Sequence, residues 1–481
     1  MKQTAAAEQA YEMVAGLEVH VELKTRTKMF CGCPNAFDAP PNTNVCPVCL
    51  GLPGALPALN REAVVYAVRA GLALHCEIAR DSAFARKHYF YPDLPKAYQI
   101  SQHEQPLCTG GWLDIRTEAG EKRIRIARLH MEEDAGKLLH GGEDTRIDLN
   151  RCGVPLVEIV TEPDFRTAAE ARAFLHGLRA VLLCIGVSDC RMNEGSMRCD
   201  VNLSVRPAGR SALGVRTEMK NINSIAFAGK AMDSEFRRQA ALLRAGGAVR
   251  RQTRRFDPAS GQTVLMREKE SEDDYRFFPE PDLPPLRLER ADIEAIRAGM
   301  PELPEEKKRR YVRTLGLTES DADILSAQPA LGAAFDLART RCREPARLAN
   351  LLVQEVSRFA DEEAQPFSPE DLAALSDLLS GETLHMGSAR RVLEHMQKTG
   401  ASPAEAVDAL ELSLLSDRAA LDAVVRGIVR DNEALAQRYR SGKVRAFQAI
   451  MGKIMQATKG RAHPAIAARL LEEVLREPDG P

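Results

Sequence analysis

Four cysteines near the N-terminus have the residue type and the spacing of a metal site. One glycine separates Cys31 from Cys33, and after twelve residues Cys46 and Cys49 follow in the string CPVC. Two close cysteine pairs beside Pro and Gly turns can supply four thiolates in a tetrahedron, which leaves zinc no open position. The spacing therefore predicts a structural zinc site near 31–49. The alternative is a set of unrelated thiols in an irregular loop.

Acidic side chains recur on segments that alternate between apolar and polar residues. Such segments are typical of strands, in which residues two apart share a face. Mg²⁺ prefers oxygen ligands, usually a few carboxylates with water and phosphates. We expect a polar sheet face that holds such a cation, and its candidates are Glu18 and His20, the acid-rich turn 128–134, Glu158 and Glu162, and Asp200 and Asn202. Any one of these acids alone could instead be a solvated surface carboxylate.

Nucleotide-binding motifs of the common kinds are missing from the sequence. It contains neither GxxxxGK[ST] nor a GxGxxG that follows a strand, so an ATP site would be neither a P-loop nor a Rossmann site. The segment 86–96, RKHYFYPDLPK, mixes cations, aromatics and turn residues. Such a loop can contact phosphates, although an ordinary loop with solvated lysines has the same composition.

A basic run lies near the C-terminus. Residues 438–461 contain seven Lys or Arg and no Asp or Glu. Gly442 and Gly460 bracket a predicted helix whose apolar stripe leaves most of the cations elsewhere on its surface. Such a patch suits a phosphate backbone, with a solvated basic helix as the alternative. Its candidate RNA-binding residues are Lys443, Lys453, Lys459 and Arg461.

The elements that must position these residues follow from periodicity. Alternation predicts strands over 12–23, 199–205 and 215–219, and helical spacing predicts a helix over 167–185 and a second one capped by Asn223 or Ser224. We expect an antiparallel sheet with one apolar face on helices and one acidic face turned outward. The proline-rich segment 277–285 predicts a rigid connector at the first domain boundary. Beyond residue 302 the pattern is helical, with Ser368 and Ser402 as helix starts.

Composition bounds the class of protein. The chain has 481 residues, 44% of them hydrophobic and 28% charged, which is typical of an ordinary globular protein and argues against disorder. Its formal net charge of -2 does not indicate a nucleic-acid binder, so RNA contacts must come from local patches. No signal peptide and no long apolar run is evident, so we expect a cytoplasmic protein without a membrane association. The odd count of eleven cysteines fits a reducing compartment.

Long local strings resemble a known family. They are GLEVHVEL, ARKHYFYPDLPKAYQISQ, RLHMEEDAGK, PLVEIVTEPD, MNEGSMRCDVNLS and DYRFFPEPDLPP, with GKIMQATKGRAHP near the C-terminus. They are similar, in the same order, to the signature segments of the GatB family of aspartyl/glutamyl-tRNA amidotransferase subunits. The resemblance implies an α+β fold: an antiparallel-sheet, kinase-like cradle domain over 1–293, a helical domain over 294–411, and a small YqeY-like tRNA-binding tail over 412–481.

The resemblance also implies a function. ATP phosphorylates the side-chain carboxylate of Asp-tRNA(Asn) or Glu-tRNA(Gln), and ammonia from a separate glutaminase subunit then gives Asn-tRNA(Asn) or Gln-tRNA(Gln). A small, belt-like third subunit completes a heterotrimer. His20, Glu133 and Glu158 stand at positions that hold Mg²⁺ in the family, with Glu18, Asp200 and Asn202 in the same signatures and Lys87 as the phosphate-facing cation. Structural Zn²⁺ occurs in part of the family. The alternative is a non-catalytic, zinc-stabilised tRNA-docking protein.

Overall fold

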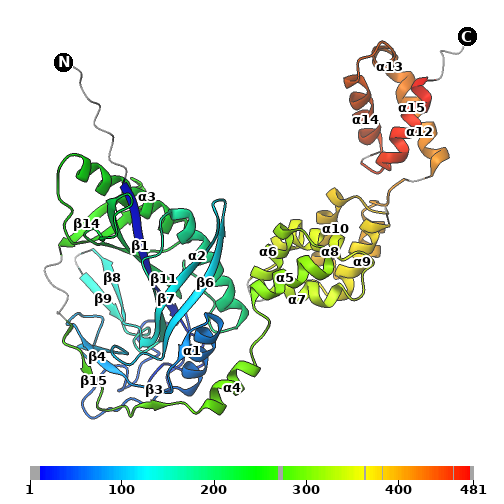
Figure 1. Ribbon diagram of the computed structural model, residues 1–481. Helices are drawn as coiled ribbons and strands as arrows, with labels where there is room; N and C mark the ends of the chain where they lie inside the picture. The colour runs from blue at the N-terminus through cyan, green and yellow to red at the C-terminus, as the bar shows by residue number, and fades with distance from the viewer. Residues whose placement is uncertain are drawn as a thin grey trace, which may run out of the picture. The chain divides into compact units, whose positions relative to one another are not determined.

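The computed structural model describes residues 11–142, 144–268, 275–361, 364–381, 383–415, 417–458 and 460–476. The chain divides into two compact units between Pro304 and Glu305. A nine-stranded sheet forms the centre of the first unit, whereas the second unit is built from helices (Figure 1). The predicted α+β class is therefore confirmed, while the likeness to kinases stays a prediction.

The large sheet has the strand order β14-β13-β12-β11-β1-β10-β7-β6-β2. Neighbouring strands are antiparallel except β12 and β13, which are parallel, so the prediction of a purely antiparallel sheet is wrong at this pair. Parallel neighbours need a crossover connection, and helix α3 supplies it. The strand bounds are β1 Tyr11–Glu22, β2 Glu77–Ile78, β6 Cys108–Thr117, β7 Gly120–Glu133, β10 Pro155–Thr161, β11 Met197–Pro207, β12 Thr217–Ile222, β13 Gln252–Asp257 and β14 Gln262–Glu268.

Strand β1 shows why one face of this sheet is apolar. Its alternate residues from Met13 to Val21 are at most 4% exposed, and they share one hydrophobic cluster with helices α2 (Ala168–Cys184) and α3 (Ile225–Arg244). The Thr167 hydroxyl accepts a hydrogen bond from Glu170 N, and the Ser224 hydroxyl accepts one from Phe227 N. These N-caps start both helices where the sequence predicts them.

The polar face of the sheet is covered rather than turned outward, contrary to the expectation from the sequence. Glu132 is 1% exposed and Glu158 is 8% exposed. A second sheet of β15 (Phe278–Pro279), β4 (Ala85–His88) and β5 (Tyr98–Ser101) brings further residues to this face. The Ser101 hydroxyl, for example, donates to Glu132 Oε2 at 3.4 Å. Periodicity assigns side chains to a face, but it cannot say what packs on that face.

The proline-rich segment 277–285 is part of the first unit and not a connector. Its two-residue strand β15 pairs with the edge of β4, a position that tolerates proline. Arg86 donates to both carboxylate oxygens of Glu280, at 2.8 and 2.9 Å, and to Asp282 at 2.9 Å. Leu283 is buried in the same core as the sheet. The segment is therefore tied down over β4.

The predicted boundary after residue 293 falls within helix α4 (Arg290–Ala298), whose Ile293 is buried in the core of the first unit. Two further hydrophobic clusters lie in the second unit, one from Tyr311 to Leu412 and one from Leu421 to Leu475. Ser368 and Ser402 cap helices as predicted. The division into three domains stays a prediction.

The remaining elements complete the described chain. In the first unit they are α1 Arg61–Ala73, β3 Asp81–Ser82, β8 Lys137–Gly141, β9 Asp144–Asp148 and β16 Leu286–Arg287. In the second unit the helices are α5 Pro304–Leu315, α6 Glu319–Ala327, α7 Pro329–Ala338, α8 Pro345–Gln354, η2 Val356–Arg358, α9 Pro369–Ser380, α10 Met386–Thr399, α11 Pro403–Ala409, α12 Arg418–Asp431, α13 Glu433–Arg440, α14 Arg445–Ala457 and α15 Pro464–Arg476.

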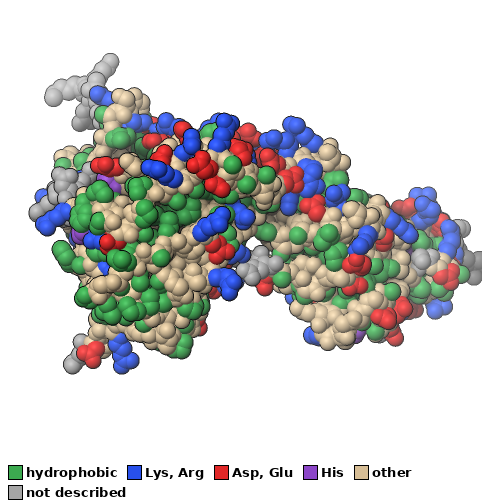
Figure 2. All heavy atoms as spheres, turned by 90° about the horizontal axis from the view of Figure 1, so that it is seen from below, with side chains coloured by type: hydrophobic (Ala, Val, Ile, Leu, Met, Phe, Trp, Pro, Cys, Tyr) green, Lys and Arg blue, Asp and Glu red, His purple; other side chains and the backbone are tan. Residues whose placement is uncertain are grey.

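Charges of both signs are interspersed on the surface seen in Figure 2, as the small net charge requires. Within the described residues, no helix is long and apolar enough to cross a bilayer.

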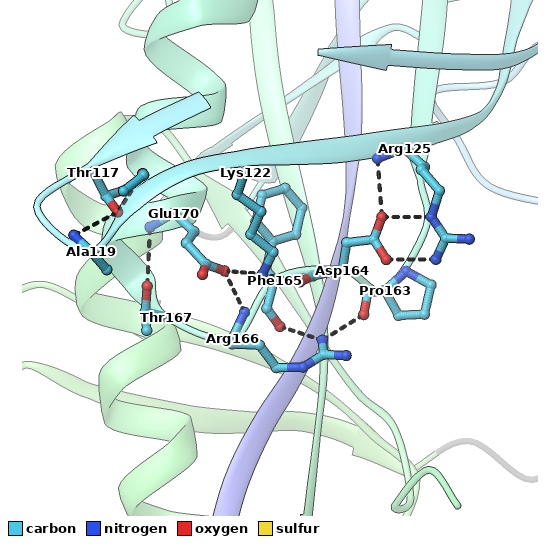
Figure 3. A network of polar contacts seen from close by, with 11 residues as sticks. Thr117, Ala119, Lys122, Arg125, Pro163, Asp164, Phe165, Arg166, Thr167 and Glu170 are labelled. Carbon is cyan, nitrogen blue, oxygen red and sulfur yellow. Dashed lines mark hydrogen bonds and ion pairs between the residues drawn. The ribbon is translucent and has the colours of Figure 1, made fainter. Parts of the chain in front are cut away.

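A polar network fixes the turn that connects β10 to α2 (Figure 3). The Asp164 carboxylate accepts hydrogen bonds from Arg125 of β7, two from the guanidinium at 3.0 and 2.7 Å and one from the backbone N–H at 3.0 Å. Lys122 donates to Asp164 O and to the Glu170 carboxylate at 2.7 and 2.8 Å. The turn is thereby held against the neighbouring strand of the sheet.

We expect Asp164→Asn to lower the melting temperature by about 2–4 °C at pH 7, which corresponds to ~1 kcal/mol in a large domain. Burial raises the pKa of Asp164, but the bonds from Arg125 bring the net shift below the ordinary value. A carboxylate with a lowered pKa contributes stability above its unfolded pKa and loses it as the pH falls through the folded pKa.

Differential scanning calorimetry at descending pH measures this effect. Asp114→Asn is the matched control, since Asp114 also forms a paired contact with an arginine of β7 but is 56% exposed, where ion pairs contribute little. Equal melting-temperature changes for the two variants would contradict a role for Asp164 in holding the turn.

Candidate active site

Three neighbouring strands place their polar side chains side by side on the covered face of the sheet. In the strand register His20 of β1 lies opposite Glu158 of β10, which lies opposite His130 of β7, and Glu132 is two residues further along β7. His20 Nε2 is 3.4 Å from Glu132 Oε1 and 3.5 Å from Glu158 Oε2. One ligand atom from each of these three residues lies within 4.8 Å of the others.

This group fits the donor set of a hard divalent cation. Two carboxylates and one imidazole converge at separations of 3.4 and 3.5 Å. Mg²⁺ at ~2.0–2.1 Å from its ligands puts neighbouring donors about 2.9 Å apart and opposite donors about 4.1 Å apart. A small inward movement of the side chains would meet that geometry.

Glu133, which the family resemblance places among the Mg²⁺ positions, lies elsewhere. Adjacent residues on a strand face opposite sides, so Glu133 points away from the group that Glu132 joins. Its carboxylate forms an ion pair with Lys96 and accepts a hydrogen bond from Ile100 N at 2.9 Å. The structure therefore brings His20 and Glu158 together as expected, with Glu132 in place of Glu133.

A second polar group adjoins the first along β1. Glu18, Asp200 and Glu218 have carboxylate oxygens within 4.8 Å of one another. Asn202 donates to Glu18 Oε1 at 2.8 Å, and Lys220 contacts Asp200 at 3.0 Å and Glu218 at 3.1 Å. The predicted residues Glu18, Asp200 and Asn202 are thus brought together.

Charge interactions shift the ionisation of this face in opposite directions. Burial by itself raises the pKa of Glu158, but the adjoining His130 and His20 bring it well below the usual range. His130 Nε2 is 3.2 Å from the Glu158 carboxylate. Burial raises the pKa of Glu18, and the nearby carboxylates of Glu158 and Asp200 raise it further. Glu158 is therefore an anion at neutral pH.

Two lysines supply positive charge to the same face. Burial lowers the pKa of Lys87, but the carboxylates of Glu132 and Glu158 raise it by more, so the net shift is upward. The pKa of Lys220 is also raised, since Asp200 and Glu218 outweigh the effect of burial. Both ammonium groups therefore stay protonated beside buried carboxylates.

A cavity of about 530 Å³ opens on this face. That volume suits a small molecule or part of a nucleotide. Cations and anions both line it, including His20, Lys87, Glu132, Asp200 and Lys220. Such a lining can hold a metal with phosphate groups beside it.

The four cysteines of the predicted zinc site also converge. Their sulfur atoms lie within 4.8 Å of one another, and Cys46 Sγ is 3.9 Å from Cys49 Sγ. Tetrahedral ligation at Zn–S of ~2.3 Å puts sulfurs about 3.8 Å apart, whereas a disulfide needs ~2.05 Å. The pKa of Cys49 is lowered to about 5, first by a hydrogen bond from Cys31 and further by the nearby Lys28 ammonium. The arrangement fits a closed tetrathiolate site.

In the C-terminal basic run, Ala446, Ile450 and Ile454 of α14 are buried as the apolar stripe predicts. Lys443 and Lys453 are exposed, and Arg461 is half-buried. Lys459 lies outside the described residues. The cations of this run therefore lie at the surface of the last hydrophobic cluster, where they could contact a phosphate backbone.

Several residues of this face are absent from the predicted set, namely Glu132, His130, Lys220 and Glu218. Alternation could have found the first two. Leu129 and Met131 are apolar and fully buried, so His130 and Glu132 must share the other face, while Glu133 shares theirs. Lys220 and Glu218 are likewise two apart on a predicted strand. For the cross-strand pairs, no signal in a single sequence specifies the register.

Comparisons with known proteins agree with the geometry. Residues 13–294 match the family model described as the GatB/GatE catalytic domain, and residues 333–475 match the GatB domain. Proteins named as the GatB-type subunit of aspartyl/glutamyl-tRNA(Asn/Gln) amidotransferase are similar over nearly the whole chain. The one from Anaeromyxobacter sp. (strain Fw109-5) is 48% identical, with 97% of this chain and 99% of the relative covered. The one from Persephonella marina is 46% identical, with 97% and 100% covered.

For the cysteine site, we expect protein purified without added metal to contain about one zinc per chain. Cys46→Ser should remove most of it, because three thiolates no longer close the tetrahedron. Elemental analysis by mass spectrometry measures the zinc content. Cys342→Ser, at a half-buried cysteine of the second unit, is the control and should keep the metal. Wild-type protein without zinc would contradict the assignment.

Proposed function

The chain belongs to the GatB family of aspartyl/glutamyl-tRNA(Asn/Gln) amidotransferase subunits, and we propose that it activates the side-chain carboxylate of Asp-tRNA(Asn), Glu-tRNA(Gln) or both. A carboxylate oxygen attacks the γ-phosphorus of ATP, ADP leaves, and an acyl phosphate forms. Ammonia then displaces inorganic phosphate and, on losing a proton, gives the amide of Asn-tRNA(Asn) or Gln-tRNA(Gln). Phosphorylation is needed because a carboxylate by itself has no good leaving group.

The observation that carries this proposal is the group of His20, Glu132 and Glu158 beside Lys87 at one cavity. We propose these three residues as Mg²⁺ ligands, with Glu132 taking the place first expected for Glu133. When bound, Mg²⁺ would neutralise phosphate charge, which is most of what a phosphoryl-transfer site must do. The anionic character of Glu158 favours a cation there.

The other side chains of the face have positioning and charge roles in this proposal. His130 contacts Glu158 at 3.2 Å and would hold its carboxylate toward His20. Lys87 lines the cavity and would face the transferred phosphoryl group. The group of Glu18, Asp200 and Asn202 lies next to the proposed metal ligands on β1 and β11 and would bound the same site. All of these groups are held on strands, which restricts their movement.

Partners and location follow from the family. We propose that a glutaminase subunit supplies ammonia and that a small third subunit completes a heterotrimer in the cytoplasm. The closed tetrathiolate site would hold structural zinc. Tail residues Lys443, Lys453 and Arg461 would contact tRNA phosphates, and Lys459 is proposed with them from the sequence alone.

A non-catalytic tRNA-docking role is the competing function. Buried carboxylates that line a cavity repel RNA phosphates unless a cation lies between them. Glu132 and Glu158 are among the least exposed acids of the sheet, which a docking surface would not require. The charge and burial of this face therefore favour the catalytic role.

To test the metal ligands, we expect Glu132→Gln to reduce phosphate release from γ-labelled ATP, with misacylated tRNA and ammonium chloride, by ~10²-fold or more. Removal of a metal ligand takes away charge neutralisation in the transition state. Ammonium chloride bypasses the glutaminase but not the activation step. Higher Mg²⁺ concentrations should restore part of the rate.

Glu121→Gln is the matched control on the same strand, because its side chain is 71% exposed and contacts only the similarly exposed Arg116 in the described structure. Glu133→Gln should leave the Mg²⁺ concentration dependence as in wild type, since its carboxylate faces the other side of β7. If Glu133→Gln changed that dependence and Glu132→Gln did not, the proposed ligand set would be incorrect.

For the tail, deletion after about Leu412 should weaken tRNA binding and leave glutaminase activity of the complex largely intact. Lys443→Ala/Lys453→Ala in the full chain should lower the slope of log affinity against log salt by about 1–2, because each phosphate contact contributes ~0.7–0.9. Filter binding over a salt series measures the slope. Arg418→Ala is the control, since that side chain is paired with Glu473 at 2.8 Å. An unchanged slope in the double variant would mean that the basic run is only a solvated surface.

A further inference from the structure

Lys28 is a buried lysine that the proposed chemistry does not use. Its side chain is among the largest that the structure buries completely, at 0% exposure. The ammonium group donates a hydrogen bond to the backbone oxygen of Asn44 at 2.7 Å. Its own backbone N–H donates to Cys33 O at 3.0 Å. Lys28 therefore lies inside the loop that carries the four cysteines.

No carboxylate neutralises this ammonium. Among the described residues, no ion pair within 4.0 Å includes Lys28. An acid on the neighbouring end of β7, Glu133, is already bonded to Lys96 and to Ile100 N. The carbonyl of Asn44 provides a dipole but no charge. A buried charge without a counter-charge is strongly unfavourable, so an anion is to be expected close by.

The thiolates are placed to supply that anion. Gly153, with a φ of +81°, passes between the lysine and the cysteines, and a Cβ at this position would lie 3.6 Å from both Lys28 Cδ and Cys49 Cβ. The absence of a side chain lets the two approach the same point. Four thiolates around a divalent cation carry a net charge of about −2, which a single neighbouring ammonium would reduce by half.

We propose that Lys28 is the buried counter-cation of the metal–thiolate centre and, through Asn44, the residue that fixes the loop between the two cysteine pairs. It touches neither substrate nor nucleotide and is a positioning residue. The inference rests on the structural zinc of the proposed function. It is independent of the ATP-dependent step, because metal retention and stability are measured without substrate.

The first test compares zinc release from the full-length, zinc-loaded chain. Lys28→Met keeps the length of the side chain and removes its charge, while Lys28→Arg keeps the charge. Zinc transfer to a chromophoric chelator should be about 10-fold faster or more in Lys28→Met, in the range found for outer-shell partners of metal ligands. Lys28→Arg should restore part of the wild-type rate. Lys137→Met, at an exposed lysine, is the control for loss of one positive charge.

The second test asks whether the lysine depends on the centre for its charge. In zinc-loaded protein Lys28→Met should lower the melting temperature. In a background with Cys31, Cys33, Cys46 and Cys49 all replaced by serine, the ammonium has no anion, so the same change should leave the melting temperature unchanged or raise it. This reversal of sign is the expected signature of a charge pair, since lost packing would have the same sign in both backgrounds.

Three outcomes would overturn the proposal. They are wild-type zinc release from Lys28→Met, an equal loss of stability in the two backgrounds, and wild-type protein without zinc. If Lys28→Met did not fold with zinc, the four-serine background would decide. Folding of Lys28→Met there supports the charge pair, and failure to fold there shows that Lys28 acts by packing alone.

Discussion

The carboxylate of Glu158 lies between two imidazoles on neighbouring strands, and the polar face of the sheet is organised around this buried charge. His130 at 3.2 Å and His20 at 3.5 Å stabilise the anion, and their effect on its pKa exceeds that of burial. A carboxylate that is buried and still charged needs such partners. Lys87 balances the same group from β4. The positions of β1, β10, β7 and β4 are therefore constrained by one electrostatic requirement.

The opposite face of the sheet meets a different requirement. Alternate residues of the same strands are apolar, and together with α2 and α3 they bury the core of the first unit. This packing makes the strands rigid enough to hold charges in register. Two peripheral contacts complete the arrangement, since Asp164 ties the turn after β10 to β7 and Arg86 ties the segment around Glu280 over β4. Burial on one side thus fixes the geometry on the other.

The end of β7 connects the two candidate metal sites. Glu132 faces the cavity, while the adjacent Glu133 faces Lys96 on the side of the cysteine loop. Gly51, just after the last cysteine of the loop, has a φ of +65°, and a Cβ on it would lie 3.0 Å from Cα of Lys96. The cysteine loop therefore packs directly on the segment that binds Glu133. A loop held by zinc and by Lys28 would support the strand that carries Glu132.

The sequence by itself determined the family, the cysteine site, the central strand, the first two large helices with their caps, and most of the polar face. These features depend on local spacing, on capping residues or on long specific strings. Only the tertiary structure decided that Glu132 rather than Glu133 joins His20, that 277–285 packs over β4, and that β12 and β13 are parallel. Alternation specifies which residues share a face of one strand. Which strands are neighbours, in which register, and what covers them depend on contacts between segments far apart in the chain.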